Sequence, residues 1–478
     1  MPEDADLNSS LAEIEQIPAL RPLLLGAVSL CLLLSVALWN GYPTVFSDTG
    51  GYLLTGATFL PYRPFRAPGY SIFVRLTSLR STAWFTIFMQ AVIVLYVLDK
   101  TCGYLIGGRR KFRSYVLLGS VGVLAALTSL PWVVSELMPD VFAGVFFLSA
   151  FLLALDGQLS LMERFALAAI LMLSVSSHMS LFPIAAIFVG TLAVSRLAGS
   201  RCPGAPPTRI MLAWLLAPVI ASGLWTAGLN QYMGLGFQLS PSRSMFLLGR
   251  LFDEGLAADF LDQNCTHRHF IACRYLSNLP RNSEEFLFQH PLLNDIEGHP
   301  KEMEEIVRGT LAAYPVRFAT SSIRGTLLQL TAIRTGDEIR SYGAWEWNNS
   351  AIKQVFPGDF SAFSHSRQFR GSLISLADAA AMLHTTTFWL STVTCLLLVW
   401  KDRMERVNYF LSWIIVFFII NAAVCATFSG VYDRYQSRVA WLMPLCFIAY
   451  VCRLLQESNE VEIREQSCGR EISAGEIA

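Results

Sequence analysis

The chain has 478 residues, of which 53% are hydrophobic and only 15% are charged. Soluble globular domains carry about a quarter of their residues as charges, so this composition excludes an ordinary soluble protein and predicts an integral membrane protein. The 36 basic and 36 acidic residues cancel, and this balance gives no reason to expect a nucleic-acid partner.

The first apolar run lies near residues 22–39 and follows an acidic tail. Because this tail lacks the basic flank of a secretory signal, and no small-residue cleavage site follows the run, the run is expected to remain as an anchor. A helix needs about 20 mostly apolar residues to cross the hydrocarbon. On that criterion, further spans are predicted near residues 82–98, 115–134, 140–156, 210–228, 384–400, 407–428 and 438–454.

The apolar stretch 165–197 could form one overlong helix or two short ones, because polar residues and Pro183 interrupt it. The basic residues favour two helices. The basic loops around 100–113, 196–209 and 401–406 fall on one side of the membrane only if this stretch crosses twice. The sequence therefore predicts about ten transmembrane helices with both termini in the cytoplasm.

The predicted fold class is an all-α membrane protein with one extracytoplasmic, soluble-like segment. No internal repeat or strand alternation is evident in the sequence, which disfavours a solenoid and an outer-membrane barrel. The polar segment is long enough for one small domain. The expected divisions are a tail 1–20, an N-terminal membrane module 21–228, an extracytoplasmic domain 229–383, C-terminal helices 384–454 and a tail 455–478.

Cys265 and Cys273 are the two cysteines of the predicted extracytoplasmic segment, in the sequence NCTHRHFIACRY. An oxidising compartment permits a disulfide between them, which is the favoured interpretation. A metal site with His267 and His269 is the alternative, although this spacing matches no standard zinc pattern well. Two free thiols are the third option.

Charged residues gather at the ends of the predicted spans. Asp48 lies in FSDTGGYLL, directly after the first span, and Arg63 and Arg66 follow it. A second acidic turn, SELMPD, carries Glu136 and Asp140 on the same predicted face. Any one of these acids could be a solvated structural residue, but ionisable residues beside a membrane are candidates for function, and two acidic turns with arginines on one face favour a site.

These motifs resemble the GT-C superfamily of polytopic membrane glycosyltransferases, such as the protein O-mannosyltransferase and aminoarabinose transferase group. The order that carries the resemblance is an Asp in the first exported loop, an Arg and Pro-Gly-Tyr segment before the second span, an acidic turn before the fourth, and DRYQSR before the last. The resemblance covers roughly residues 20–200 and 405–454. The single acid of the first motif departs from the Asp-Glu pair of many relatives.

The resemblance implies roles for individual residues. Asp48 is expected to be the catalytic base, with Glu136 and Asp140 near the acceptor or near an assisting divalent cation. Arg434 and Tyr435 are expected to bind the lipid phosphate of the donor. Tyr52 is a candidate for substrate contact. For His178, helix capping or packing is the alternative to contact with substrate.

The residues are suited to this chemistry without the family. Transfer from a polyprenyl-phosphate sugar needs a carboxylate to take a hydroxyl proton and cations to hold the departing phosphate. The planar guanidinium groups of Arg63, Arg66 and Arg434 suit phosphate oxygens. The expected function is a glycosyltransferase of the bacterial inner membrane, with membrane lipids, a polyprenyl-phosphate sugar and a glycan or lipid acceptor as partners. A transporter or flippase of lipid-linked sugars, or a non-catalytic assembly protein, are the alternatives.

Overall fold

The computed structural model describes residues 20–60, 66–107, 110–199, 204–337, 339–341, 346–401 and 404–475. Within these ranges the regular secondary structure is helical, and extended pairing is limited to an isolated parallel bridge between Thr44 and Glu136. The all-α prediction is confirmed. Five helical stretches in the described ranges are long and apolar enough to cross a membrane, namely Trp84–Leu105, Thr208–Tyr232, Ile374–Val399, Glu405–Phe428 and Arg434–Ser458.

Several helices of the N-terminal half overlap the predicted spans, and others lie between them. In chain order they are α2 (Leu20–Leu33), α3 (Ser35–Asn40), α4 (Thr49–Thr58), α5 (Pro68–Ser78), α6 (Trp84–Leu105), α7 (Arg110–Leu127), α8 (Leu130–Ser135), α9 (Val141–Leu155), α10 (Leu161–Ser177), α11 (Leu181–Leu197) and α12 (Thr208–Tyr232).

The second half contains shorter elements before the last long helices. These are α13 (Arg243–Asp253), α14 (Leu256–Asn264), η1 (Ile271–Asn278), η2 (Glu285–Gln289), α15 (Pro291–Ile296), α16 (Pro300–Ala313), α17 (Pro315–Thr331), α18 (Glu346–Val355), η3 (Pro357–Asp359), α19 (Phe360–Ser364), α20 (Ile374–Lys401), α21 (Glu405–Phe428), α22 (Arg434–Ala440) and α23 (Leu442–Gly475).

The ambiguous stretch 165–197 forms two helices, α10 and α11, as the basic loops indicated. Ser160 starts α10 with a capping box, in which its side chain and that of Glu163 each bind the other residue's backbone N–H. The helix ends at His178, whose backbone is extended. Two other predicted spans also divide, the first into α2 and α3 and the third into α7 and α8.

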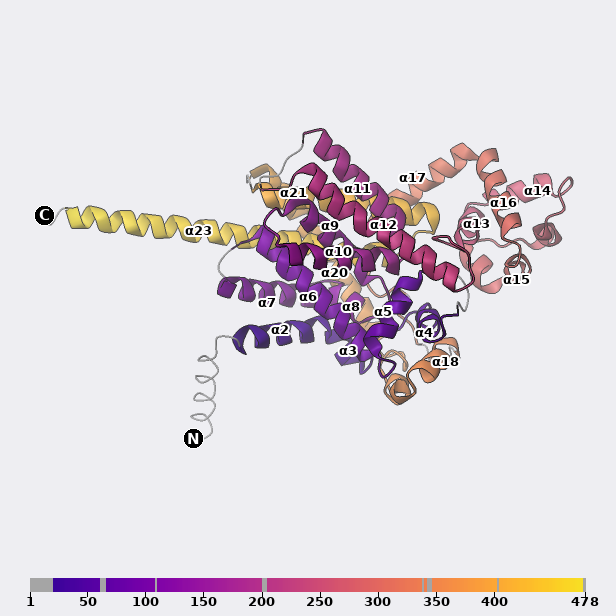
Figure 1. Ribbon diagram of the computed structural model, residues 1–478, viewed down its shortest axis with the longest axis horizontal. Helices are drawn as coiled ribbons and strands as arrows, with labels where there is room; N and C mark the ends of the chain where they lie inside the picture. Colours follow the sequence, from indigo (N-terminus) through magenta and orange to yellow (C-terminus); the bar gives the residue numbers. More distant parts are fainter. Residues whose placement is uncertain are drawn as a thin grey trace.

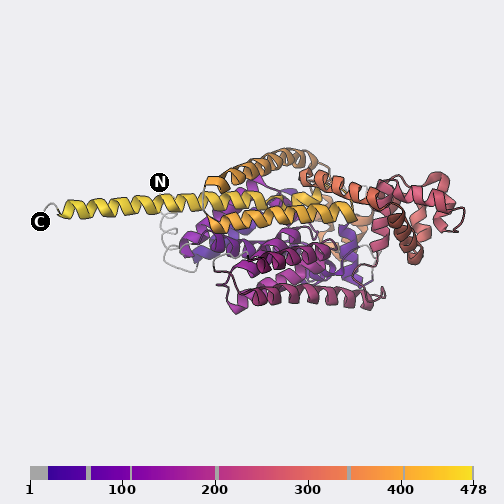
Figure 2. The same cartoon turned by 90° about the horizontal axis from the view of Figure 1, so that it is seen from above.

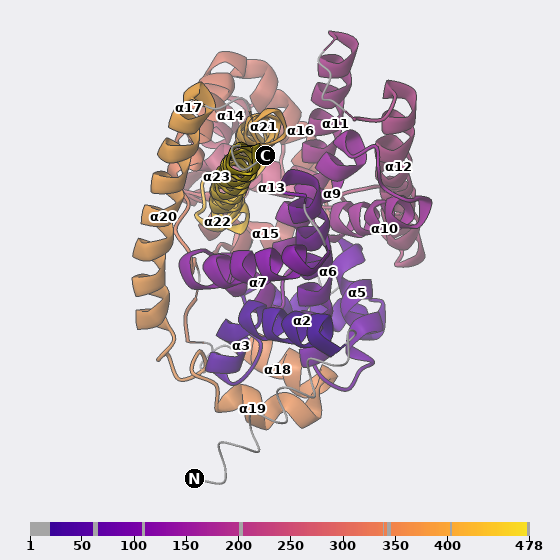
Figure 3. The same ribbon diagram turned by 90° about the vertical axis from the view of Figure 1, so that its left-hand side faces the viewer.

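Helix α9 is the centre of the bundle (Figure 3). All fifteen of its residues are buried. Its phenylalanine rings pack against rings of α11 and α21, for example Phe147 against Phe417 with centroids 4.9 Å apart. Such close-packed aromatic contacts fix how the helices are placed relative to one another. By contrast, α20 lies at the outer edge of the bundle.

The segment 229–383, expected to be one small domain, contributes to more than one hydrophobic core. Elements α13 to α16 share a core of their own, which includes Leu251, Phe286 and Ile306, and form a lobe at one end of the molecule (Figure 1). Helix α17 returns from this lobe to the bundle and packs along α21 (Figure 2). Beyond it, α18 packs on α4 and joins the core of the bundle.

The starts of α4, α9 and α22 meet through the ion pairs described below. They lie near the lobe, since Arg250 of α13 donates to the carbonyl of Ala426 near the end of α21, just before α22. The far end of α23 lies at the opposite end of the molecule from the lobe (Figure 1). We call the end where these helix starts meet the site end of the bundle.

Candidate functional site

Asp48 occupies the N-cap position of α4, and its carboxylate forms an ion pair with the guanidinium group of Arg66. Helices α4 and α5 pack against each other, which brings Arg66, just before α5, next to Asp48. Gly51 lies beneath the arginine, because a Cβ atom there would stand 3.3 Å from its side chain. The small residues of TGGY therefore leave room for this ion pair.

Asp140 holds the same position at the start of α9. Its two carboxylate oxygens accept from two arginines of α22, with Nη2 of Arg434 at 3.1 Å and Nη1 of Arg438 at 3.3 Å. The Asp140 and Arg438 side chains are buried, the second completely, whereas that of Arg434 is 17% exposed. A carboxylate at a helix N-terminus is also favoured by the helix dipole.

Arg434 connects the two acidic positions. Its Nη1 lies 4.0 Å from Oδ2 of Asp48, and its guanidinium carbon stands 4.0 Å from the centre of the Phe46 ring. The result is a continuous series, Arg66, Asp48, Arg434, Asp140 and Arg438, which we call the ion-pair chain. It contains three guanidinium groups and two carboxylates, which leaves one excess positive charge.

His178 completes the buried end of the ion-pair chain. Its Nε2 lies 3.3 Å from Nη1 of Arg438, and its Nδ1 lies 2.8 Å from Oγ of Ser180. Burial and then the nearby Arg438 charge lower the pKa of His178 to about 3. A neutral imidazole can accept from the guanidinium group, which gives this histidine a structural role beside Arg438.

The pKa of Asp140 is shifted by opposing effects. Burial acts to raise it, but the charges of Arg434 and Arg438 and the hydrogen bond from Arg438 outweigh burial, so the pKa of this carboxyl lies below its usual range. Burial, followed by the charge of Asp48, raises the pKa of Tyr52. Asp140 is therefore ionised and Tyr52 protonated at neutral pH.

Glu136 lines a small cleft beside the ion-pair chain, together with Asp140, Asp337 and Arg434. The backbone of Thr44 pairs with the turn at Glu136 and so ties the Asp48 loop to the second acidic turn. With a volume of about 40 Å³, the cleft is suited to a few water molecules rather than to a sugar ring. A larger ligand requires the arginine side chains to move.

A divalent cation near Asp48, Glu136 or Asp140 would have to compete with arginines for the carboxylates. Both aspartates direct oxygens at guanidinium groups in this structure. Among the residues that the structure describes, no group of three or more histidine, cysteine, aspartate or glutamate side chains could hold a metal ion.

Comparison of the chain with protein-family models, with curated proteins and with solved structures gives no match.

The structure brings together the residues predicted at the two acidic turns and at DRYQSR. Arg63 lies outside the described residues. The Tyr435 ring lies beside the guanidinium groups of Arg434 and Arg438, and its hydroxyl is 2.8 Å from Oγ of Ser429, so in this structure the tyrosine supports the arginines. Tyr52 packs edge-on against Tyr70 and lies near Arg66.

Sequence reasoning did not select Arg438, although a signal was available. Arg438 lies four residues after Arg434, so on one helix the two side chains occupy the same face. Both reach Asp140, as that spacing allows.

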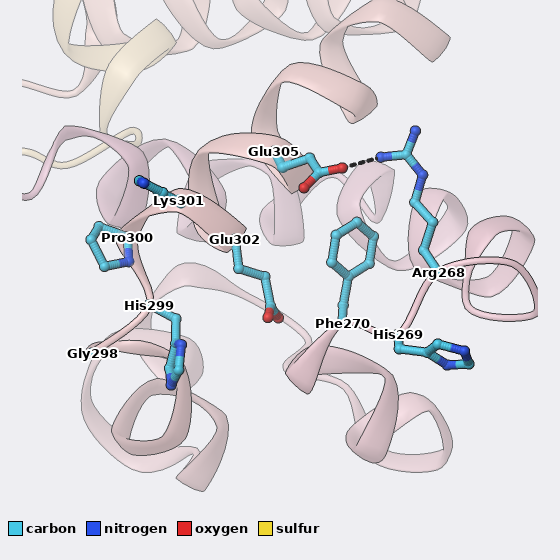
Figure 4. A pocket seen from close by; sticks show the side chains of 9 residues that line it. All are labelled: Arg268, His269, Phe270, Gly298, His299, Pro300, Lys301, Glu302 and Glu305. Atoms are coloured by element: carbon cyan, nitrogen blue, oxygen red, sulfur yellow. Dashed lines mark hydrogen bonds and ion pairs between the residues drawn. The ribbon is translucent and has the colours of Figure 1, made fainter.

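Cys265 and Cys273 form a disulfide, with Cα atoms 5.6 Å apart. The closed loop forms one wall of a second cavity of about 730 Å³, and the start of α16 forms the other (Figure 4). Here Arg268 pairs with Glu305, and Glu302 accepts from the backbone N–H of Ala272. No residue of the ion-pair chain lines this open hollow, and its acids are engaged with neighbouring groups of the lobe.

Proposed function

We propose that the protein is a membrane glycosyltransferase that moves a sugar from a polyprenyl-phosphate donor to an acceptor outside the cytoplasm. The observation that carries the proposal is the ion-pair chain, in which Asp48 is flanked by the guanidinium groups of Arg66 and Arg434. A carboxylate that can act as a base and guanidinium groups that can bind a phosphate thus lie within one site. The GT-C resemblance of the sequence supports the same function.

In the proposed reaction, an acceptor hydroxyl attacks the anomeric carbon of the donor sugar. The bond between this carbon and the phosphate oxygen breaks, and the polyprenyl phosphate leaves with the electron pair. Asp48 takes the hydroxyl proton, and guanidinium groups stabilise the phosphate. Because the leaving group is already anionic, no general acid is required.

The ion pair between Asp48 and Arg66 suits a resting state. In this ion pair an oxygen of the Asp48 carboxylate is engaged by Arg66 and is not free to accept a proton from an acceptor hydroxyl. A donor phosphate would compete with Asp48 for Arg66 and Arg434 and would free the carboxylate when the substrate arrives. This exchange also supplies the side-chain movement that the small cleft requires.

The proposal includes a membrane orientation. About ten helices cross the inner membrane of a bacterium, both termini lie in the cytoplasm, and the site end of the bundle with the α13 to α16 lobe lies outside. The four shorter apolar helices, Arg21–Leu33, Phe112–Leu127, Val141–Leu155 and Leu181–Leu197, would join the five longer ones as spans, and α10 would be the tenth.

Substitution Asp48→Asn tests the proposed base, because it preserves shape and removes the proton acceptor. In membranes supplied with a panel of polyprenyl-phosphate sugars, we expect turnover to fall by about 100-fold or more. Arg434→Lys keeps the charge but loses the planar fork, so we expect a higher donor KM with a smaller effect on kcat.

Asp259→Asn is a matched control, since Asp259 pairs with Arg317 at 2.7 Å on the exposed surface of the lobe. This control should transfer sugar at the parental rate. Parental turnover in Asp48→Asn would refute the base assignment. If the parent used no polyprenyl-linked sugar, a transporter or flippase would become the better hypothesis.

A further inference from the structure

Three side-chain amides from α17 and the segment after it bind the loops that carry Asp48 and Arg434. They belong to Gln329, Asn348 and Gln368, which are at most 2% exposed. Each amide uses both its carbonyl oxygen and its NH₂ group on backbone atoms of one loop.

Two of the amides hold the Asp48 loop. Gln368 binds Val45 on both sides, accepting from its N–H at 2.9 Å and donating to its carbonyl at 2.6 Å. Asn348 donates to the carbonyl of Phe46 at 2.8 Å and accepts from the N–H of Gly50 at 2.8 Å. Asp48 lies in the middle of the turn that Asn348 spans.

The third amide holds the Arg434 loop. Gln329, at the end of α17, donates to the carbonyl of Tyr432 at 2.8 Å and accepts from its N–H at 2.9 Å. Shortly after α17, Asp337 accepts from the backbone N–H of Arg434 at 3.1 Å. The start of α22 is thus fixed by groups from another part of the chain.

We propose that Gln329, Asn348 and Gln368 are positioning residues, which clamp the two loops so that Arg66, Asp48 and Arg434 stay in register. Their importance to catalysis rests on the proposed function, whereas their effect on side-chain geometry does not. A side-chain amide suits this role because it provides a donor and an acceptor at once. A buried backbone group that loses its partner is costly, so each clamp resists displacement of its loop.

Gly50, which donates to Asn348, also supports this interpretation. A Cβ atom at position 50 would stand 2.7 Å from Nε1 of Trp347 and 2.9 Å from Oδ1 of Asn348. Both are closer than real contacts allow. Gly50→Ala should therefore push Asn348 away from the Asp48 turn and reproduce the effect of Asn348→Ala.

The test measures how fast individual arginines react with phenylglyoxal in the purified full-length protein, with mass spectrometry to identify each site. Arg434 and Arg66 are largely shielded in the structure. Gln329→Leu should raise the labelling rate of Arg434 by about tenfold, since loss of a buried hydrogen-bonding pair is worth about that factor. Asn348→Ala and Gly50→Ala should raise the rate at Arg66 instead.

The internal standards are Arg308, which is exposed, and Arg438, which is fully buried. Asn230→Leu is the matched control, since Asn230 is a buried amide that donates to the backbone of Gln238 and Leu239. It should leave both site arginines at the parental rate. Unchanged labelling of Arg434 in Gln329→Leu would overturn the clamp.

If Arg438 also became reactive, the variant would have lost its fold, and the milder Gln329→Glu, which keeps shape and one hydrogen bond, would decide. Parental labelling of Arg434 in Gln329→Glu would then count against the clamp, and a selective rise would support it. The kinetic readout is separate. Gln329→Leu should raise the donor KM and Asn348→Ala should lower kcat, whereas equal losses in both would indicate a general structural role.

The two proposals can fail independently. The variants could change arginine labelling selectively while the parent transfers no polyprenyl-linked sugar. That result would support the clamps and reject the transferase.

Discussion

Arg438 shows how one residue can organise a buried polar site. Its guanidinium group contacts Asp140, His178 and Ser180, and also donates to Oδ1 of Asn421 at 3.0 Å. A buried charge needs both a counterion and hydrogen bonds to offset its loss of solvation. Arg438 has both, so we interpret it as the inner anchor of the ion-pair chain, while the side chain of Arg434 keeps a small exposed fraction.

His178 gives a prediction on pH at this scale. The pKa of His178 is about 3 in the folded protein, below the ordinary value of 6.5. The unfolded chain therefore binds a proton that the folded chain does not between these two values, and stability rises with pH across that window. The stabilising effect is complete above about pH 6.5 and is lost as the pH falls towards 3.

His178→Gln should make the thermal unfolding of the detergent-solubilised protein less sensitive to pH between 6.5 and 4. His267→Gln, at an exposed position of the lobe, is the control and should follow the parent curve. Identical pH slopes for His178→Gln and the parent would contradict the assignment of a neutral, buried imidazole.

At the scale of elements, the disulfide loop and α16 form a unit within the lobe. The disulfide closes the sequence between Cys265 and Cys273, and Arg268 of that loop reaches Glu305 of α16. A closed loop has fewer unfolded conformations, so the bond favours the folded lobe.

Thiol labelling with mass spectrometry checks this bond. A maleimide should modify neither Cys265 nor Cys273 in the native protein until a reductant is added. Cys273→Ser should expose Cys265 to the reagent, which provides the positive control. Ready labelling of both cysteines without reductant would show that the bond is absent.

Helices α10 and α11 show how far local sequence can lead. The polar interruption at residues 176–178 and the basic loops together predicted two helices, and the capping box of Ser160 starts the first of them. The division of the first and third predicted spans was missed, because the residues around Leu34 and Thr128 are compatible with a continuous apolar helix.

At the scale of the whole molecule, the orientation in the membrane decides on which side the site end of the bundle lies. Reporter fusions after Arg113, Arg201 and Arg403 should give a cytoplasmic signal, because basic loops are retained on that side. A fusion near Asn282, in the lobe, should report the opposite side. A cytoplasmic signal at Asn282 would place the whole site end of the bundle on the wrong side for a polyprenyl-phosphate donor presented outside.

The sequence by itself determined the class of the molecule and the types of residue in its site. Composition and the lengths of the apolar runs indicated an all-helical membrane protein. A membrane span must be apolar along one continuous segment and must satisfy its backbone hydrogen bonds within that segment, so the local sequence is enough to predict it. Motif order selected Asp48, Glu136, Asp140 and Arg434 as candidates. The spacing of two cysteines allowed a disulfide.

Only the tertiary structure decided which groups are partners. Arg434 meets Asp140 across 294 residues, and Asn348 reaches Phe46 across 302. The sequence does not show whether a buried amide or a buried acid binds a neighbouring turn or a distant loop. Their partners are fixed by how α9, α17 and α22 pack, since helix packing places side chains that no local pattern relates.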